Sequence, residues 1–156
     1  MEITKTPDEI LAKKMEKVSV DNIKKGLYKD LISDMRKAMM EHNGIGLAAN
    51  QVGKDLSIFV IDQKLAEESG VPDVFINPEI TGYSKETDET EEGCLSIPDY
   101  WVPIKRAKKI KIKAVDENGN KIKFKAKGFL ARVLQHETDH LNGVTIKFRA
   151  AKNPKS

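Results

Sequence analysis

The sequence contains a single cysteine, Cys94, among 156 residues. One cysteine cannot form an internal disulfide, which excludes the disulfide-rich class of small secreted domains and fits a reducing compartment. No apolar run approaches the ~18 residues of a membrane-spanning helix, and no apolar segment follows residues 1–5 as a secretory signal requires. Internal repeats, linkers and low-complexity tracts are also lacking. We therefore expect one cytoplasmic globular domain over residues 1–156, with no membrane partner.

Aromatic residues are scarce as well, at 6%, whereas charged residues make up 33% of the chain and give a net charge of +3. Much of the positive charge lies in residues 105–113, where a nucleic-acid site is one interpretation. Lysines there alternate with Ile110, Ile112 and Ala114 at period two, which favours a strand with a solvated lysine face. We expect no sequence-specific nucleic-acid binding.

The chain has only three histidines, and two of them, His136 and His140, lie four residues apart. On a helix this spacing places both imidazoles on one face, where they can bind a single metal ion. Glu137 lies beside them and can act as general base on metal-bound water. Phe129, Val133, His136 and His140 follow one another at helical spacings, so we expect them on the core-facing side of a helix. A metal favours such burial over a solvated helix turn, because burying an unpartnered polar group is costly.

Two histidines do not complete a catalytic metal site, which usually has three protein ligands and one open position. The sixteen residues after His140 contain no Asp, Glu or His, so the third ligand has to lie upstream. Cys94 is the candidate, because Gly93 permits a close backbone approach and a thiolate binds first-row divalent metals strongly. A lone cysteine is more often a small buried hydrophobe, which remains the alternative.

A further stretch, residues 44–53, has glycines spaced by two, followed by small residues and Gln51. A glycine-rich packing loop is one interpretation. A dinucleotide-binding loop is disfavoured, because Gly44 follows a helical segment rather than a strand. The functional interpretation is a loop whose backbone binds an extended peptide and whose Gln51 donates an amide N–H to a developing oxyanion.

The coarse secondary-structure pattern is mixed. Residues 20–41 predict an amphipathic helix with Leu27, Leu31, Met35 and Met39 at spacing four. Short strands are predicted at 57–62 and 74–77, a hairpin at 110–115 and 122–126 across Asn118-Gly119, and the motif helix at 129–142. Strands between two helices predict an α+β fold, with antiparallel β-sheets packed around a central metal-binding helix and an N-terminal helix besides.

With these stretches in order, the sequence resembles the peptide deformylase family, whose members share the motifs G-x-G-x-A-A-x-Q, E-G-C-L-S and H-E-x-D-H. All three are complete here, at residues 44–51, 92–96 and 136–140, and the resemblance covers most of residues 25–148. The family removes the N-formyl group from the formylmethionine of nascent polypeptides and releases formate. The resemblance therefore implies a metal-dependent hydrolase acting on formylated nascent peptides, at the ribosome in some settings, and we expect a monomer.

The resemblance also implies the role of each motif residue. The metal ligands would be Cys94, His136 and His140, holding Fe(II) natively, with Zn(II), Ni(II) or Co(II) able to substitute. Glu137 would be the general acid and base, and Gln51 with the backbone N–H of Leu95 would stabilise the oxyanion. Substrate would pair with the backbone of Gly44, Ile45 and Gly46 as an added strand, and Phe129 and Val133 would wall the methionine pocket. Glu92 and Arg106 match a structural ion pair, whereas Asp139 either supports the site or is a solvated carboxylate.

Three departures from many bacterial relatives stand out. Asn50 replaces a Pro or Thr, which we expect to have little effect. Asp99-Tyr100-Trp101 stands where relatives carry a substrate-contacting Arg, so Trp101 either covers the peptide or is a partly exposed aromatic. No C-terminal helix is expected in residues 149–156, a short basic tail expected to fray. Shortened forms occur among phage-encoded relatives, so a phage source is compatible with the sequence.

Two other classes of function share part of this pattern. A zincin-type metallopeptidase would carry H-E-x-x-H but would need a ligand downstream of His140, which is absent. A non-catalytic metal-binding or nascent-chain-binding module would be expected to lack Glu137 or Gln51, and both are present.

Overall fold

The computed structural model describes residues 1–152 and contains two antiparallel sheets. The larger sheet has the strand order β1-β2-β3-β6-β7, and the smaller sheet pairs β4 with β5. The strands span Gly46–Ala48 (β1), Ile58–Ile61 (β2), Val74–Tyr83 (β3), Thr87–Cys94 (β4), Ile97–Ala107 (β5), Lys109–Val115 (β6) and Lys121–Lys127 (β7). This arrangement confirms the predicted α+β class with antiparallel sheets.

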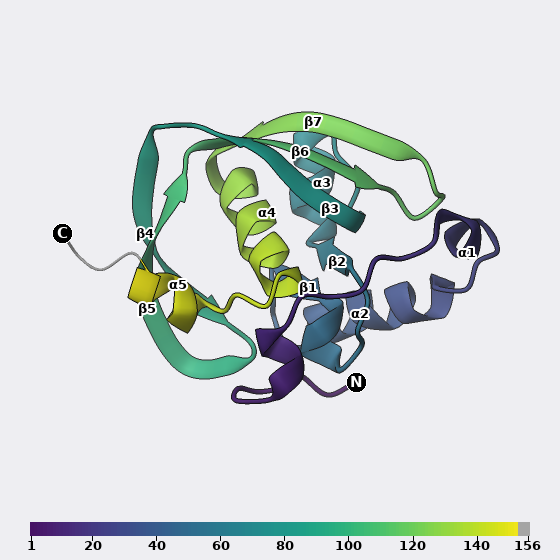
Figure 1. Cartoon of the computed structure of the whole chain (residues 1–156), viewed down its shortest axis with the longest axis horizontal. Helices are drawn as coiled ribbons and strands as arrows, with labels where there is room; N and C mark the ends of the chain where they lie inside the picture. Colours follow the sequence, from purple (N-terminus) through teal and green to yellow (C-terminus); the bar gives the residue numbers. More distant parts are fainter. Residues whose placement is uncertain (153–156) are drawn as a thin grey trace.

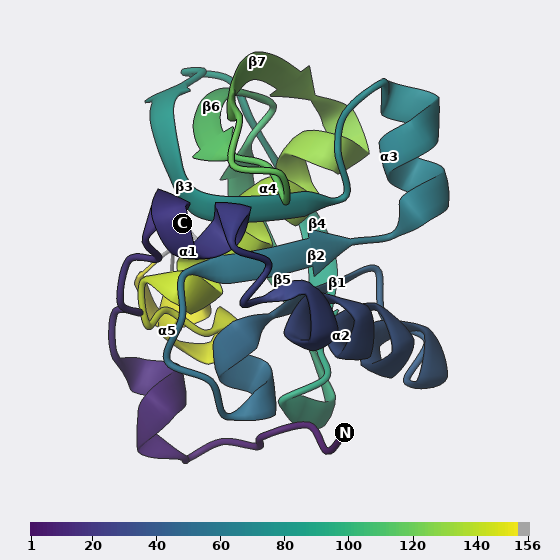
Figure 2. The same ribbon diagram turned by 90° about the vertical axis from the view of Figure 1, so that its right-hand side faces the viewer.

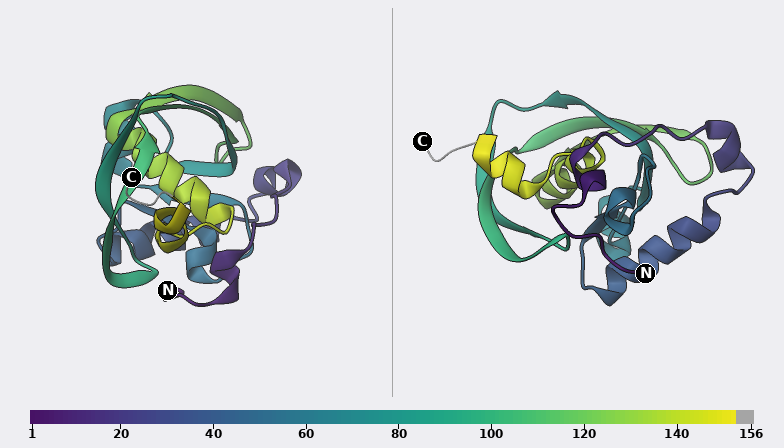
Figure 3. Two further views of the ribbon diagram at one scale, coloured as in Figure 1. Left: turned by 60° about the vertical axis from the view of Figure 1, so that its left-hand side comes forward. Right: turned by 60° about the horizontal axis from the view of Figure 1, so that its bottom comes forward.

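One helix, α4 (Gly128–Leu141), lies in the middle of the molecule, with strands curving around it (Figures 1 and 3). It contacts every strand of the larger sheet as well as β5. The other helices are α1 (Val20–Lys24), α2 (Lys29–Glu41), α3 (Gln63–Ser69) and α5 (Ile146–Lys152), with short 3₁₀ turns at Glu9–Ala12 and Ala49–Val52. No helix among the described residues is long and apolar enough to cross a membrane.

Two apolar clusters hold the larger sheet from both faces. Alternate residues of β2 point to opposite faces, so Phe59 packs toward α4 while Ile58 and Val60 pack toward α2. The ring of Phe59 stacks on that of Phe75, with centroids 5.0 Å apart. Figure 2 shows α2 below β2 and α4 above it. Because both faces are covered, β2 is buried along its whole length, which explains its uninterrupted apolar sequence.

The predicted N-terminal helix over residues 20–41 is wrong as one element. It is broken into α1 and α2 at Gly26, whose φ of 78° is left-handed and ends the first helix. Leu27 therefore leaves the apolar stripe and is 62% exposed, whereas Met35 and Met39 are buried as expected. The four apolar residues of the predicted stripe all follow Gly26, so their spacing carried no information on the break before them.

Strand predictions were correct for the hairpin and incomplete elsewhere. β6 and β7 pair across the turn at Asn118-Gly119, as predicted. The lysine-rich stretch 105–113 is not one strand, because the chain bends at Lys108 and passes from the smaller sheet into the larger one. β4 was not predicted at all, since acidic residues are depleted in strands.

The expectation that no helix fits at the C-terminus is also wrong. α5 begins at Ile146, before the stretch considered, and packs against β5 and β4. Ile146 is buried beside Ile97 and Ile104, which anchors the short helix despite its basic composition. The predicted fraying concerns mainly residues 153–156, which lie outside the described part of the chain.

Candidate active site

The sulfur of Cys94 and one ring nitrogen of each of His136 and His140 converge at the centre of the molecule. All three ligand atoms lie within 4.8 Å of one another. Nε2 of His140 is 3.2 Å from Sγ of Cys94 and 3.2 Å from Nε2 of His136. The two histidines come from successive turns of α4, and Cys94 ends β4 beside the two-residue turn that leads to β5.

The chemistry of this donor set fits a metal ion. The edges of a tetrahedral site with bonds of roughly 2.0–2.3 Å are roughly 3.3–3.7 Å long, close to the two separations of 3.2 Å that His140 makes with Cys94 and His136. Burial raises the pKa of the Cys94 thiol, but the two histidines outweigh it and lower that pKa to about 5. The thiolate is therefore available at neutral pH, as a metal ligand must be.

Glu92 orients His136 by contacting the ring nitrogen Nδ1. Its Oε1 lies 2.9 Å from Nδ1 of His136, which leaves Nε2 facing Cys94 and His140. Arg106 donates to both oxygens of Glu92, at 2.7 and 2.9 Å, so the ion pair implied by the resemblance is confirmed. Burial opposes ionisation of Glu92, yet Arg106 and His136 hold its pKa well below the usual range. Arg132 donates to the same carboxylate, and sequence reasoning missed it.

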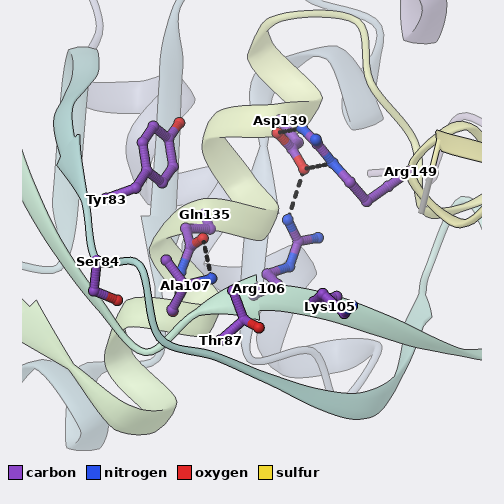
Figure 4. Close-up of a pocket in the computed structure, with 9 residues that line it drawn as sticks. All are labelled: Tyr83, Ser84, Thr87, Lys105, Arg106, Ala107, Gln135, Asp139 and Arg149. Atoms are coloured by element: carbon purple, nitrogen blue, oxygen red, sulfur yellow. Dashed lines mark hydrogen bonds and ion pairs between the residues drawn. The ribbon is translucent and has the colours of Figure 1, made fainter. Parts of the chain in front are cut away.

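Asp139 is held between two arginines and is not a solvated carboxylate. It accepts from Nη1 of Arg106 at 2.7 Å and from Nη2 of Arg149 at 2.7 Å, and its side chain is only 15% exposed. Figure 4 shows both arginines meeting this carboxylate. All three side chains line a cavity of about 250 Å³. A chain of ion pairs therefore runs from α5 through Asp139 and Arg106 to Glu92, and the contact of Glu92 with Nδ1 of His136 extends it to the ring.

Gln51 is buried, with its amide oriented by two kinds of contact. Its Oε1 accepts from the backbone N–H of Ala48 at 3.0 Å, which directs Nε2 toward Cys94. Nε2 lies 3.4 Å from Sγ of Cys94 and 3.2 Å from Oγ of Ser96. An N–H donor thus faces the space next to the three converging ligand atoms. Leu95 lies in the adjoining turn between Cys94 and Ile97.

Asn50 is more important to the structure than expected. It is fully buried, and its Nδ2 donates to the backbone carbonyl of His140 at 2.7 Å. This bond ties the end of α4 to the 3₁₀ turn that carries Gln51. The expectation of little effect from Asn50 is therefore not supported by the contacts.

Glu137 lies beside the ligand cluster with one oxygen free. Oε2 is 3.9 Å from Nε2 of His136, and the buried Oε1 has no hydrogen-bond partner among residues 1–152. Burial raises the pKa of this carboxyl above its ordinary value of 4.5, against the lowering influence of His136 and His140. A buried carboxylate with a raised pKa and an unused oxygen can exchange a proton with a bound reactant.

A cavity of about 880 Å³ opens onto this cluster. Of the sequence-predicted site residues, His140 alone lies behind its wall; the others line it, namely Gly44, Ile45, Gly46, Gln51, Cys94, Leu95, Phe129, Val133, His136 and Glu137. Phe129 was expected on the buried stripe of α4, but it is 58% exposed, because the first turn projects beyond the core into the cavity.

Trp101 forms part of the cavity rim. It is 67% exposed and its indole packs over Gly93, where an added Cβ would lie 2.8 Å from the ring. The close approach that Gly93 permits is thus made by an aromatic ring. Ser96, Arg132 and Arg149 are the site residues that sequence reasoning missed. Arg132 carried a usable signal, since it precedes His136 by four residues on the helix, whereas Arg149 carried none.

Comparisons with known proteins agree with this geometry. A family described as polypeptide deformylase matches residues 1–155. The chain is 53% identical over 137 residues to peptide deformylase 1 of Clostridium perfringens, covering 88% of each sequence. It matches the crystal structure of peptide deformylase from Thermotoga maritima with a TM-score of 0.85 and 40% identity over 95% of each chain. The deformylase of Vibrio parahaemolyticus bacteriophage VP16T, solved with actinonin, matches with a TM-score of 0.82 and 38% identity, over 93% of this chain and 99% of that one.

Proposed function

Because the chain belongs to the polypeptide deformylase family, we propose that its converging motif residues form the centre that hydrolyses the N-formyl group of formylmethionyl peptides. The protein is a deformylase of nascent polypeptides, and the zincin alternative is set aside. The observation that carries the assignment of the site is the convergence of a cysteine thiolate and two imidazoles beside one cavity, next to Glu137. We propose further that residues 1–156 act as one catalytic domain.

Cys94, His136 and His140 would hold one metal ion, natively Fe(II), with Zn(II), Ni(II) or Co(II) able to substitute. When bound, the ion supplies Lewis acidity and lowers the pKa of a coordinated water. Support for this ligand set comes from the separations of the three atoms and from the lowered pKa of Cys94. Glu92 keeps His136 in the tautomer that presents Nε2 to the ion.

Glu137 would take a proton from the attacking water and pass it to the departing amine. Its burial and unused oxygen support this role, because a carboxyl with a raised pKa both accepts and returns a proton near neutral pH. Nε2 of Gln51 and the backbone N–H of Leu95 would stabilise the oxyanion of the formyl group. The bond from Ala48 supports this by holding the Gln51 amide in place before substrate arrives.

The peptide would bind along the edge of the larger sheet. β1 is an edge strand, so the backbone groups of Gly44, Ile45 and Gly46 can pair with an extended chain as an added strand. Phe129 and Val133 line the same cavity from α4 and would contact the methionine side chain. We propose that the enzyme is a cytoplasmic monomer and that it meets its substrates at the ribosome.

The test is formate release from formyl-Met-Ala-Ser by protein prepared without oxygen and loaded in parallel with Fe(II), Ni(II) or Zn(II). Release with Fe(II) or Ni(II), and none from acetyl-Met-Ala-Ser, is expected. Actinonin, which occupies the phage deformylase structure, should inhibit it. Absence of formate from every metal form that contains one ion per chain would refute the activity.

Two variants separate the roles in the site. Glu137→Ala should abolish turnover while metal content survives, because this carboxylate is not among the three converging ligands. Cys94→Ala should lose the metal itself, as measured by elemental analysis. Retained turnover in Glu137→Ala would overturn the general-base role, and full metal content in Cys94→Ala would overturn the ligand set.

A further inference from the structure

Every exposed residue of β6 and β7 is a lysine. The inward residues of these two strands are apolar and belong to or pack against the cluster around α4. We call the outward set the lysine array; it consists of Lys109, Lys111, Lys113, Lys121, Lys123, Lys125 and Lys127. The hairpin thus presents a purely cationic face with no exposed apolar side chain.

The register of the hairpin places these lysines directly opposite one another. Lys109 pairs with Lys127, Lys111 with Lys125, and Lys113 with Lys123. Like charges directly opposite each other destabilise an antiparallel pair, so three such pairs in succession carry a cost. The sequence shows the alternation, but the facing of lysine against lysine is visible only in the structure.

The array is hardly neutralised by the protein itself. Within residues 1–152, only Lys113 of the seven forms an ion pair, with Glu79 at 3.3 Å, and both side chains are more than half exposed. The net charge of the whole chain is +3, so the seven positive charges of the array exceed it. Acidic residues gather instead on β4, in the other sheet. The result is a localised positive field that attracts a polyanion.

We propose that the lysine array is a docking surface for the phosphate backbone of folded RNA. The array is roughly 20 Å long along β7, which matches about six nucleotide steps of one strand. Lysines bind phosphates as point charges and read no sequence, in keeping with the absence of sequence-specific recognition. A membrane surface fits less well, because interfacial binding also uses apolar burial and this face exposes none.

The choice of RNA among polyanions rests on the proposed function, since formylated chains emerge from the ribosome, which is rich in RNA. The last lysine of the array is also close in sequence to residues of the candidate active site. Lys127 directly precedes Gly128 and Phe129, which line the cavity. In a protein docked through β6 and β7, the cavity therefore lies near the Lys127 end of the docked surface.

Binding can be measured with a fluorescent RNA hairpin whose stem is longer than the array, by anisotropy over a range of salt concentrations. The array variant is Lys111→Gln/Lys123→Gln/Lys125→Gln. The matched control is Lys25→Gln/Lys37→Gln/Lys64→Gln, which removes the same charge from exposed lysines outside the array. The array variant should bind about tenfold or more weakly, and its log affinity should fall with log salt by about two to three units less steeply. The control should stay close to the parent.

Equal weakening by the two variants would overturn the proposal, because net charge alone would then account for binding. It would also fail if the parent bound phosphatidylserine vesicles or polyglutamate through the array but bound no RNA. Formate release from formyl-Met-Ala-Ser by the same preparations separates this proposal from the enzymatic one, since none of the substituted lysines belongs to the site. A parent protein that turns over fully but binds no RNA would count against the array alone, and a parent that binds RNA without turnover would count against the activity alone.

Discussion

The cavity wall leaves no room for one additional methyl group beside Glu137. A Cβ on Gly46 would lie 2.6 Å from Oε2 of Glu137, a buried carboxylate that cannot move away freely. We expect Gly46→Ala to lower kcat/KM by about 100-fold, because displacing a catalytic group by about 1 Å has effects of that size. Steady-state kinetics on formyl-Met-Ala-Ser and elemental analysis would check this.

Metal content should be unchanged in Gly46→Ala. The control is Gly82→Ala, whose added Cβ would meet only the flexible side chain of Lys111 at 3.4 Å. Parent-like kinetics in Gly46→Ala would mean that Glu137 is not held where the structure has it.

A second single-residue prediction concerns Asn50. Asn50→Ala removes the donor to the carbonyl of His140 from a fully buried position. The carbonyl keeps its bond from the backbone N–H of Gly143 at 3.0 Å, so the variant loses one buried hydrogen bond and leaves no acceptor unpaired. The free energy of unfolding in urea should therefore fall by about 0.5–1.5 kcal/mol. Asn118→Ala, in the exposed hairpin turn, serves as the control and should change it by less than about 0.5 kcal/mol. An equal, small change in both variants would show that the bond contributes nothing.

Most individual site residues were accessible from the sequence because they lie in short contiguous motifs. His136, Glu137 and His140 share one helix, and local spacing alone places them together. Some of the contacts that support them join different elements of the fold. Arg149 reaches Asp139 only because α5 folds back on β5, and nothing near position 149 indicates this. Long-range contacts of this kind depend on the tertiary fold and have no local pattern.

At the scale of elements, α5 is a short helix fastened mainly by Ile146. This side chain is 2% exposed and packs with Ile97 and Ile104, in the cluster against which Cys94 also packs. Ile146→Ala should lower the free energy of unfolding by about 2–5 kcal/mol, because it leaves a cavity under the helix. Urea denaturation followed by circular dichroism would measure it.

Lys147→Ala is the control within the same helix, since it removes only a contact with the ring of Tyr100 at 5.4 Å. Its effect should stay at or below about 1 kcal/mol. If both variants lost the same stability, packing of Ile146 would not be what holds α5.

Prediction of elements succeeded where periodicity and turn chemistry agreed. The lysine–isoleucine alternation together with Asn118-Gly119 located β6 and β7 correctly. It failed where composition misled, as in β4. The acidic residues of this strand have low strand propensity, but the strand forms because it pairs with β5. Prediction failed also at Gly26, because the apolar spacing begins only at Leu27 and does not extend across the left-handed glycine that ends the first helix.

At the scale of the whole molecule, the three candidate ligands join the smaller sheet to the central helix. Cys94 belongs to β4, whereas His136 and His140 belong to α4. An ion bound by all three links parts of the chain 42 or more residues apart and stabilises the folded state alone. At a metal concentration of 100 Kd this adds about 2.7 kcal/mol, a rise in Tm of roughly 5–10 °C.

Calorimetry of the protein after chelation and after reloading with Ni(II) would measure the rise. Cys94→Ala should show little or none of it, whereas Gly82→Ala should show it in full. A Tm unaffected by metal in the parent would mean that these residues do not act together as a site.

The central position of α4 has a further consequence for how the protein opens. Because this helix touches every strand of the larger sheet, its amide hydrogens can reach solvent only when most of the core comes apart. They should therefore exchange with deuterium at the slowest rates in the molecule, while those of α1, outside the central layers, exchange far sooner. The Glu137 carboxylate and the imidazoles of His136 and His140 thus lie on the segment expected to unfold last. We therefore expect their spacing to be preserved while less protected parts of the molecule open locally.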